Sequence, residues 1–152
     1  MVIEVLVRAK AAKVLGKRLS KSRIQRRARK LLSALACECC ELSILLTGDA
    51  EISKLNQVYR NKKGPTDVLS FAMHEGRGAP LPEGLLGDVA ISVETAARQA
   101  EEDGSPLADE LLRLLIHGVL HLCGFEHEGV SARKAAQMKK AERQYFVELK
   151  AI

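Results

Sequence analysis

The sequence predicts an α+β fold in which a mixed sheet of roughly four strands packs against helices. The chain has 152 residues and is 47% hydrophobic, which suits a single domain, residues 1–152, with one core. Short runs rich in valine, isoleucine and leucine alternate with segments of helical period, in the order β-α-β-α-β-β-α-α-α. No internal repeat, low-complexity tract or interdomain linker interrupts this order, so we expect one folding unit.

The predicted strands are short and are separated by turn-forming residues. They are expected at about residues 2–8, 41–48, 67–74 and 85–92. The segment NKKGPT, residues 61–66, ends the preceding helix because it holds a proline and several turn residues. A loop rich in glycine and proline, residues 75–84, separates the last two strands.

Helices are predicted where apolar residues recur every three or four positions. They cover about residues 22–36, 49–60, 93–103, 106–122 and 131–149. Ser20 or Ser22 is expected to cap the first of these helices, and Asp49 the second. Apolar residues run so densely from Leu111 to Leu122 that we expect this helix to be buried on most sides.

Basic residues are concentrated in one segment of the chain. Residues 8–30 contain eleven of the 24 lysines and arginines and none of the 19 acidic residues, so a charge of +11 stands beside a remainder of −6. Such a local field favours a polyanionic partner, nucleic acid rather than a membrane, although a solvated helix face would give the same pattern. The outer side of the basic helix supplies the expected backbone contacts, Arg23, Arg26, Arg27 and Lys30.

Apolar runs and cysteines indicate the compartment. No apolar run approaches the roughly 20 residues that a membrane-spanning helix needs. The first residues, MVIEVLVRAK, carry neither a basic leader nor a small-residue cleavage site, so we expect a cytoplasmic protein with no membrane partner. In that compartment the four cysteines are expected to be reduced, partly buried thiols, with a redox or metal role for Cys37 and Cys40 as the alternative.

Three of the four histidines fall within HGVLHLCGFEH, residues 117–127. His117 and His121 are four residues apart on the predicted buried helix, so both imidazoles stand on one face, one turn apart. Gly124 follows where a helix end often needs a left-handed residue, and a turn there brings His127 back. Three imidazoles with an open position are typical of a catalytic zinc site, whereas a single histidine in an apolar helix is usually a core residue. We expect one Zn²⁺ per chain.

The spacing H-x-x-x-H-x-x-G-x-x-H equals that of the metzincin proteases, which place a glutamate, the general base, directly after the first histidine. Here that position is Gly118, which cannot accept a proton, and Met138 sits in a helical pattern rather than in a methionine turn. Proteolysis is therefore disfavoured. Cys123 lies on another side of the helix and is excluded as a ligand, and His74 is expected to be a surface residue at a strand end.

Three stretches of the chain are informative together: LNQVYRNKKGPTDVLSF at 55–71, LLGDVAIS at 85–92 and HGVLHLCGFEH at 117–127. They resemble the YbeY family of endoribonucleases. The resemblance covers about residues 41–130 in the family's order and spacing. It departs from the family pattern at Ala72, where proline is usual, and at Glu126, where aspartate is frequent.

The resemblance implies a zinc-dependent, single-strand endoribonuclease that acts in rRNA processing, notably 3′ end maturation of 16S rRNA, and in ribosome quality control. Its partners would be ribosomal RNA and the small ribosomal subunit. It implies zinc on His117, His121 and His127, and a functional arginine at Arg60. Zinc and an arginine fork suit a phosphodiester, because both stabilise the charge that develops on its oxygens.

Two other functions stay open on the sequence. A ribosome-associated assembly factor would bind RNA without cutting it, and its zinc would be mainly structural. A hydrolase of some small substrate would use the same histidines but would leave the basic segment without a purpose.

Overall fold

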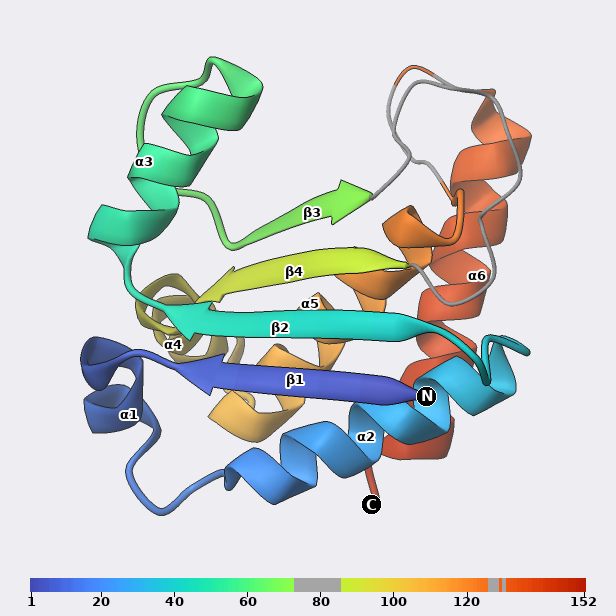
Figure 1. The fold of residues 1–152 in the computed structure, drawn as a ribbon, viewed down its shortest axis with the longest axis horizontal. Coiled ribbons are helices and arrows are strands. Elements are labelled where there is room, and N and C mark those ends of the chain that lie inside the picture. Colours follow the sequence, from blue (N-terminus) through green and yellow to red (C-terminus); the bar gives the residue numbers. More distant parts are fainter. Residues whose placement is uncertain (73–85, 126–128, 130) are drawn as a thin grey trace.

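The computed structural model describes residues 1–72, 86–125, 129 and 131–152. Within these residues, four strands form one sheet in the order β1 (Val2–Val7), β2 (Glu41–Thr47), β4 (Gly87–Ser92) and β3 (Val68–Ala72). The strands β1, β2 and β4 are parallel, and β3 pairs with β4 in the antiparallel direction. The mixed four-stranded sheet of the predicted α+β fold is therefore confirmed (Figure 1).

Helices connect and cover the strands. In chain order they are α1 (Ala9–Leu15), α2 (Lys21–Ala34), α3 (Asp49–Arg60), α4 (Val93–Asp103), α5 (Leu107–Leu122) and α6 (Ala132–Leu149). All five predicted helices are present, and α1 is an addition that the sequence did not indicate. Ser20 caps α2 as expected, because its hydroxyl accepts a hydrogen bond from the Arg23 amide.

The prediction that Asp49 caps α3 is wrong. Gly48 is the N-cap residue, and Asp49 is already the first residue of the helix. The Asp49 carboxylate instead accepts hydrogen bonds from the start of α4, where Ser92, Thr95 and Arg98 donate to it. Burial raises the pKa of Asp49, but the three hydrogen bonds together outweigh it and leave the pKa below its ordinary value.

The main core lies on one face of the sheet. Figure 1 shows α4 and α5 behind the strands, and the core joins strand residues such as Val5, Ile44 and Val89 to apolar residues of α2, α4, α5 and α6. On the opposite face α3 forms a smaller cluster, in which Ile52 meets Leu69 and Ala90. The alternation of Val89 and Ala90 between the two clusters follows from the two-residue period of a strand.

The helix α5 runs through the middle of the main core, as its apolar density predicts. Eleven of its sixteen residues are buried. Burial on most sides fixes its position against the sheet, and only a few of its side chains reach the surface. Across the part of the chain that the structure describes, no helix is both long enough and apolar enough to cross a bilayer.

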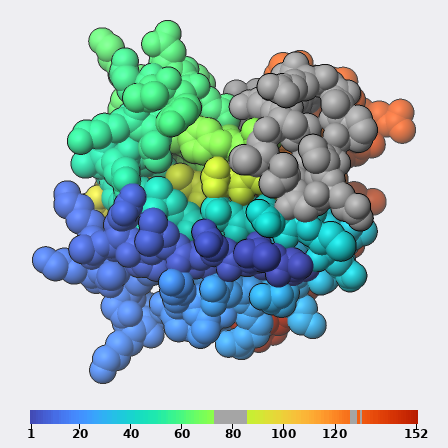
Figure 2. Space-filling model, in the orientation of Figure 1, coloured from blue at the N-terminus to red at the C-terminus, as the bar shows by residue number. Residues whose placement is uncertain are grey.

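The other face of the sheet is open between β1 and α3. Figure 2 looks onto this hollow, which has a volume of about 550 Å³ and lies between the blue atoms of β1 and the green atoms of α3. Leu6 and Tyr59 at its edges are 51% and 66% exposed. This open face lies across the sheet from α5, the helix that carries His117 and His121 and that we call the candidate metal helix.

Candidate metal centre and active site

The first two predicted metal ligands converge on one point. The Nε2 atoms of His117 and His121, one turn apart on α5, lie 3.1 Å from each other, with the rings 4.6 Å apart between centroids. Two imidazole nitrogens held at about 2.0–2.1 Å by one tetrahedral Zn²⁺ would be about 3.3 Å apart. The pair therefore fits a shared zinc ion with little adjustment.

The third predicted ligand, His127, lies outside the described residues, as do His74 and Glu126. Among the residues with a described position, no three histidine, cysteine or acidic side chains are grouped so that they could hold an ion. The three-histidine site therefore stays a prediction, and the structure gives the geometry of two of its members.

Glu142 orients the first histidine, and the sequence reasoning did not identify it. Its Oε1 atom on α6 lies 3.3 Å from Nδ1 of His117. An ionised carboxylate only accepts hydrogen bonds, so this contact requires the proton of the neutral imidazole to sit on Nδ1. The lone pair is then on Nε2, the atom that faces His121, as in the carboxylate–histidine pairs that support zinc sites. The sequence held a signal for this role, because Glu142 is a charged residue in the otherwise apolar series Met138, Tyr145 and Leu149, which recurs at helical spacing.

The turn after α5 has the form that Gly124 predicted. Gly124 adopts the left-handed conformation with φ of +94°. Its amide donates to the His121 carbonyl, and the Phe125 amide donates to the Leu120 carbonyl. These two bonds form a Schellman motif, which ends the helix after Leu122 and turns the chain one turn beyond His121.

Gly118 allows close packing between α5 and the sheet, a role that the comparison with the metzincin motif did not indicate. A Cβ atom at this position would lie 2.8 Å from Cγ1 of Val89, 3.1 Å from Oγ of Ser70 and 3.3 Å from Cγ2 of Val68. The helix α5 therefore approaches β3 and β4 closely at the turn that carries His117. Gly118 stands where the metzincins have their glutamate, and its lack of a side chain lets the candidate metal helix lie against the sheet.

Arg60 is connected to this turn through Ser70. Arg60 is exposed at the end of α3, and its Nη2 atom donates to the Ser70 carbonyl at 2.8 Å. The buried Ser70 hydroxyl in turn donates to the Gly118 carbonyl at 2.8 Å, between the two histidines. The structure thus holds the predicted arginine on β3, the strand that packs against the candidate metal helix.

The basic helix does not present all four predicted contacts to solvent. Arg26 and Lys30 are exposed, but Arg23 is half-buried and its Nε donates to the main-chain oxygen of Ile152. Arg27 is 2% exposed, so its prediction as an RNA contact is wrong. Arg29, which was not among the predicted contacts, is exposed together with Arg26 and Lys30 on the outer side of α2.

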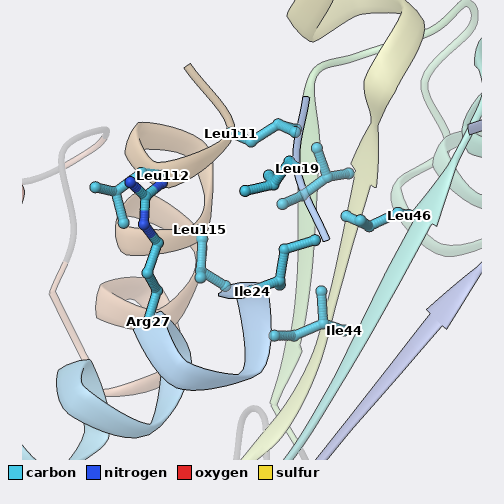
Figure 3. A pocket seen from close by; sticks show the side chains of 9 residues that line it. Leu19, Ile24, Arg27, Ile44, Leu46, Leu111, Leu112 and Leu115 are labelled. Atoms are coloured by element: carbon cyan, nitrogen blue, oxygen red, sulfur yellow. The ribbon is translucent and has the colours of Figure 1, made fainter. Parts of the chain in front are cut away.

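Arg27 instead joins three segments of the fold. Its guanidinium donates to the carbonyls of Ala108, Lys150 and Ile152 at 3.0, 3.0 and 3.2 Å. Figure 3 shows its side chain beside Leu112, in a small cavity otherwise lined by apolar residues. Burial and then the nearby Arg23 charge lower the pKa of Arg27, against the opposing effect of Asp109.

The four cysteines are free thiols, as expected. The Cys37 thiol lies close enough to those of Cys40 and Cys123 to influence both, so the loop before β2 meets the end of α5. Burial, reinforced by Cys37, raises the pKa of the Cys40 thiol to about 11. A raised pKa keeps a thiol protonated at neutral pH, which favours the structural interpretation of this cluster.

Comparison with known proteins agrees with the family resemblance that the sequence indicates and with the observed fold. A family model described as endoribonuclease YbeY matches residues 9–150. Relatives of the same name are 44% identical over 124 residues in Geobacter metallireducens, spanning 82% of this chain and 83% of the relative. In Aquifex aeolicus the identity is 48% over 124 residues, spanning 82% of this chain and 77% of the relative.

The likeness extends to a solved structure. The solution structure of TM1509 from Thermotoga maritima matches with a TM-score of 0.61 and 28% identity, covering 97% of this chain and 89% of that one. The family match spans nearly the whole chain, including residues 9–40, for which the sequence motifs gave least guidance. The resemblance inferred from three short stretches is confirmed, and the chain belongs to the endoribonuclease YbeY family.

Proposed function

We propose that this protein is a zinc-dependent endoribonuclease that cuts single-stranded ribosomal RNA in the cytoplasm. Its roles would be 3′ end maturation of 16S rRNA and ribosome quality control, with the small ribosomal subunit as its partner. The observation that carries the proposal is the pair of Nε2 atoms 3.1 Å apart in a chain of this family, one of them oriented by Glu142.

His117, His121 and His127 would hold the zinc ion. When bound, zinc supplies a Lewis acid for the phosphodiester and lowers the pKa of a bound water. Glu142 keeps His117 in the tautomer that binds metal, and the Schellman turn at Gly124 directs the chain away from the helix one turn beyond His121. Glu142 and the turn at Gly124 would thus position the histidines for the metal.

Arg60 would bind the phosphate and stabilise its developing charge. Its guanidinium is exposed, and one nitrogen is anchored to the Ser70 carbonyl, which limits how the side chain moves. Guanidinium groups hold phosphate oxygens through paired hydrogen bonds that lysine cannot reproduce. The exposed cations Arg26, Arg29 and Lys30 would bind RNA backbone further from the cut.

The metal site is tested with the His121→Ala variant. Metal analysis of the purified wild-type protein should give about one zinc per chain, and the variant should lose it together with cleavage of a labelled single-stranded RNA. Full zinc retention by the variant would overturn the site. Binding of RNA without cleavage by the zinc-loaded wild type would instead favour an assembly factor.

The role of Arg60 is tested separately from the metal. The Arg60→Ala variant should cut RNA at least about tenfold more slowly, equivalent to about 1.4 kcal/mol of lost transition-state stabilisation, with normal zinc content. Lys54→Ala, an exposed cation on the same helix, is the matched control and should keep its activity. An RNA with one deoxynucleotide at the cut then shows whether the 2′-hydroxyl attacks, because only that mechanism needs it.

A further inference from the structure

A second surface adjoins the candidate metal centre, between α5 and α6. It is a groove of about 470 Å³, which we call the α5–α6 groove, lined by Arg113, Lys139, Glu142, Arg143, Phe146 and Val147. All of the α6 members recur at spacings of three or four residues, so they form one stripe along that helix.

The groove borders the first predicted metal ligand, His117, through Glu142. Glu142 contacts His117, and one turn further along each helix the Arg113 guanidinium lies 4.4 Å from the centre of the Phe146 ring. Residue numbers fall along α5 while they rise along α6, so the two helices are antiparallel here. Arg113 and His117 are four residues apart and share one face of α5. The groove therefore lies beside His117, on the Nδ1 side of its ring, and runs from there along the helix pair.

The charge of the groove is positive. Arg113, Lys139 and Arg143 are exposed cations, and the lining's one carboxylate, Glu142, is engaged by His117. Arg113 also forms an ion pair of 3.4 Å with Glu110, a residue that is only 7% exposed and lies outside the lining. The lining thus offers two cations on α6 without a carboxylate partner among the contacts of the described residues.

Apolar surface lies beside these cations. Val147 is 70% exposed, and the Phe146 ring is half-buried between the two helices, with Lys150 5.7 Å from its centre. Cations that follow a backbone, next to an aromatic or apolar surface for bases and sugars, are the features of single-strand nucleic-acid grooves. A membrane surface would ask for a broader apolar face than two residues.

We infer that the α5–α6 groove binds the single-stranded RNA backbone on one side of the scissile phosphate. Lys139 and Arg143 would contact phosphates, with Arg113 over Phe146 as the floor. This inference rests on the proposed function, because it takes RNA as the substrate. It adds a subsite on the last helix, on residues that lie neither in the histidine motif nor in the basic helix α2.

The test compares two double variants of one helix. The groove variant is Lys139→Glu/Arg143→Glu, and the control is Arg133→Glu/Lys140→Glu. Both change the charge of α6 by the same amount, and all four residues are exposed, but Arg133 and Lys140 are not part of the groove lining. A general effect of net charge would therefore change both variants equally.

Binding is measured by the anisotropy of a labelled 2′-O-methyl oligoribonucleotide with the zinc-loaded protein. The groove variant should bind at least tenfold more weakly, and its log–log salt slope should be smaller by about 1.4, or about 0.7 for each lost contact. The control should stay within threefold of the wild type. Equal affinities in the two variants would overturn the inference. If the glutamates disturb folding, Lys139→Gln/Arg143→Gln replaces them, with at least a threefold loss expected.

Single-turnover cleavage of the matching RNA gives the second measurement. The groove variant should need at least tenfold more enzyme for half-maximal rate, while its maximal rate stays within threefold of the wild type, because the histidines are untouched. Failure of the proposed function looks different, since the wild-type enzyme would then leave RNA uncut. The groove fails if the wild type does not bind the oligonucleotide, or if all three proteins bind it alike, whatever happens to cleavage.

Discussion

Nδ1 of His117 and Oε1 of Glu142 lie 3.3 Å apart, and this contact joins the candidate metal helix to the last helix of the chain. The carboxylate fixes the imidazole tautomer, so its loss should reach the metal. We expect Glu142→Gln to weaken zinc binding about 10–100-fold, as other residues that orient metal ligands do. Competition with a chelator measures the affinity. Glu148→Gln, an exposed glutamate of the same helix, should bind zinc normally. Equal affinities in both variants would show that the contact does not orient the ring.

Gly118→Ala should destabilise the fold. At an exposed position within a helix, this change stabilises by about 1 kcal/mol. Here the added methyl group would meet Val89, Ser70 and Val68, so we expect a net loss of about 1–3 kcal/mol from overpacking. Urea unfolding of the wild type and the variant gives the change in the free energy of unfolding, and its sign is sufficient to test the prediction. A gain in stability would mean that α5 does not need a glycine to approach the sheet.

Arg27 and Arg26 should behave in opposite ways although they are neighbours. Arg27→Met removes the donor to three main-chain oxygens, and we expect the free energy of unfolding to fall by about 3 kcal/mol. Arg26→Met should change stability by less than about 0.5 kcal/mol, since its side chain is exposed. It should instead weaken RNA binding. Thermal unfolding and RNA anisotropy, measured on both variants, separate the two roles, and a stable Arg27→Met protein would contradict this assignment.

The thiol of Cys40 should be protected from alkylation at neutral pH. Burial and the neighbouring Cys37 thiol raise its pKa to about 11, so little thiolate exists at pH 8. Exposed Cys39 should therefore react with iodoacetamide first, as peptide mass spectrometry after a time course would show. Early modification of Cys40 at pH 8 is the contrary outcome.

The same thiol should affect stability at alkaline pH. A raised pKa means that the folded state holds this proton more tightly than the unfolded state does. The contribution is therefore complete below the ordinary value of 9.0 and is lost as the pH rises to about 11. Cys40→Ala should weaken the dependence of unfolding on pH across that window.

The sequence predicted most of the fold because local patterns and tertiary packing agree. The strands and the five longer helices follow residue periodicity, and Ser20 and Gly124 are side-chain and backbone signals that act within one turn. The short helix α1 has no such signal: Arg8 makes no capping hydrogen bond, and the first turn holds no acidic residue. Its stability comes from packing, with Ala11 and Leu15 buried in the core.

The residues that the sequence misjudged depend on distant partners. Aspartate is a common helix-capping residue, but the carboxylate of Asp49 accepts hydrogen bonds from Ser92 and Thr95 at the start of α4 instead. Arg27 lies among basic residues of α2, and only the docking of the last residues of the chain decides that it is buried. Glu142 was missed for the same reason, because its partner His117 is 25 positions away. Helical periodicity assigns a face to a residue, but it does not say what covers that face.

The placement of Glu142 on the last helix also orders the events of biosynthesis. A ribosome delivers the sheet-forming strands and the basic helix first, and a domain generally folds as a unit once its parts have emerged. The carboxylate that prepares His117 arrives only when α6 has been translated and has docked on α5. A prematurely terminated chain would then still carry the cations of α2 that we propose bind RNA, but it would hold zinc poorly. Such fragments would bind RNA without cutting it, so nuclease activity would be restricted to chains whose last helix is in place.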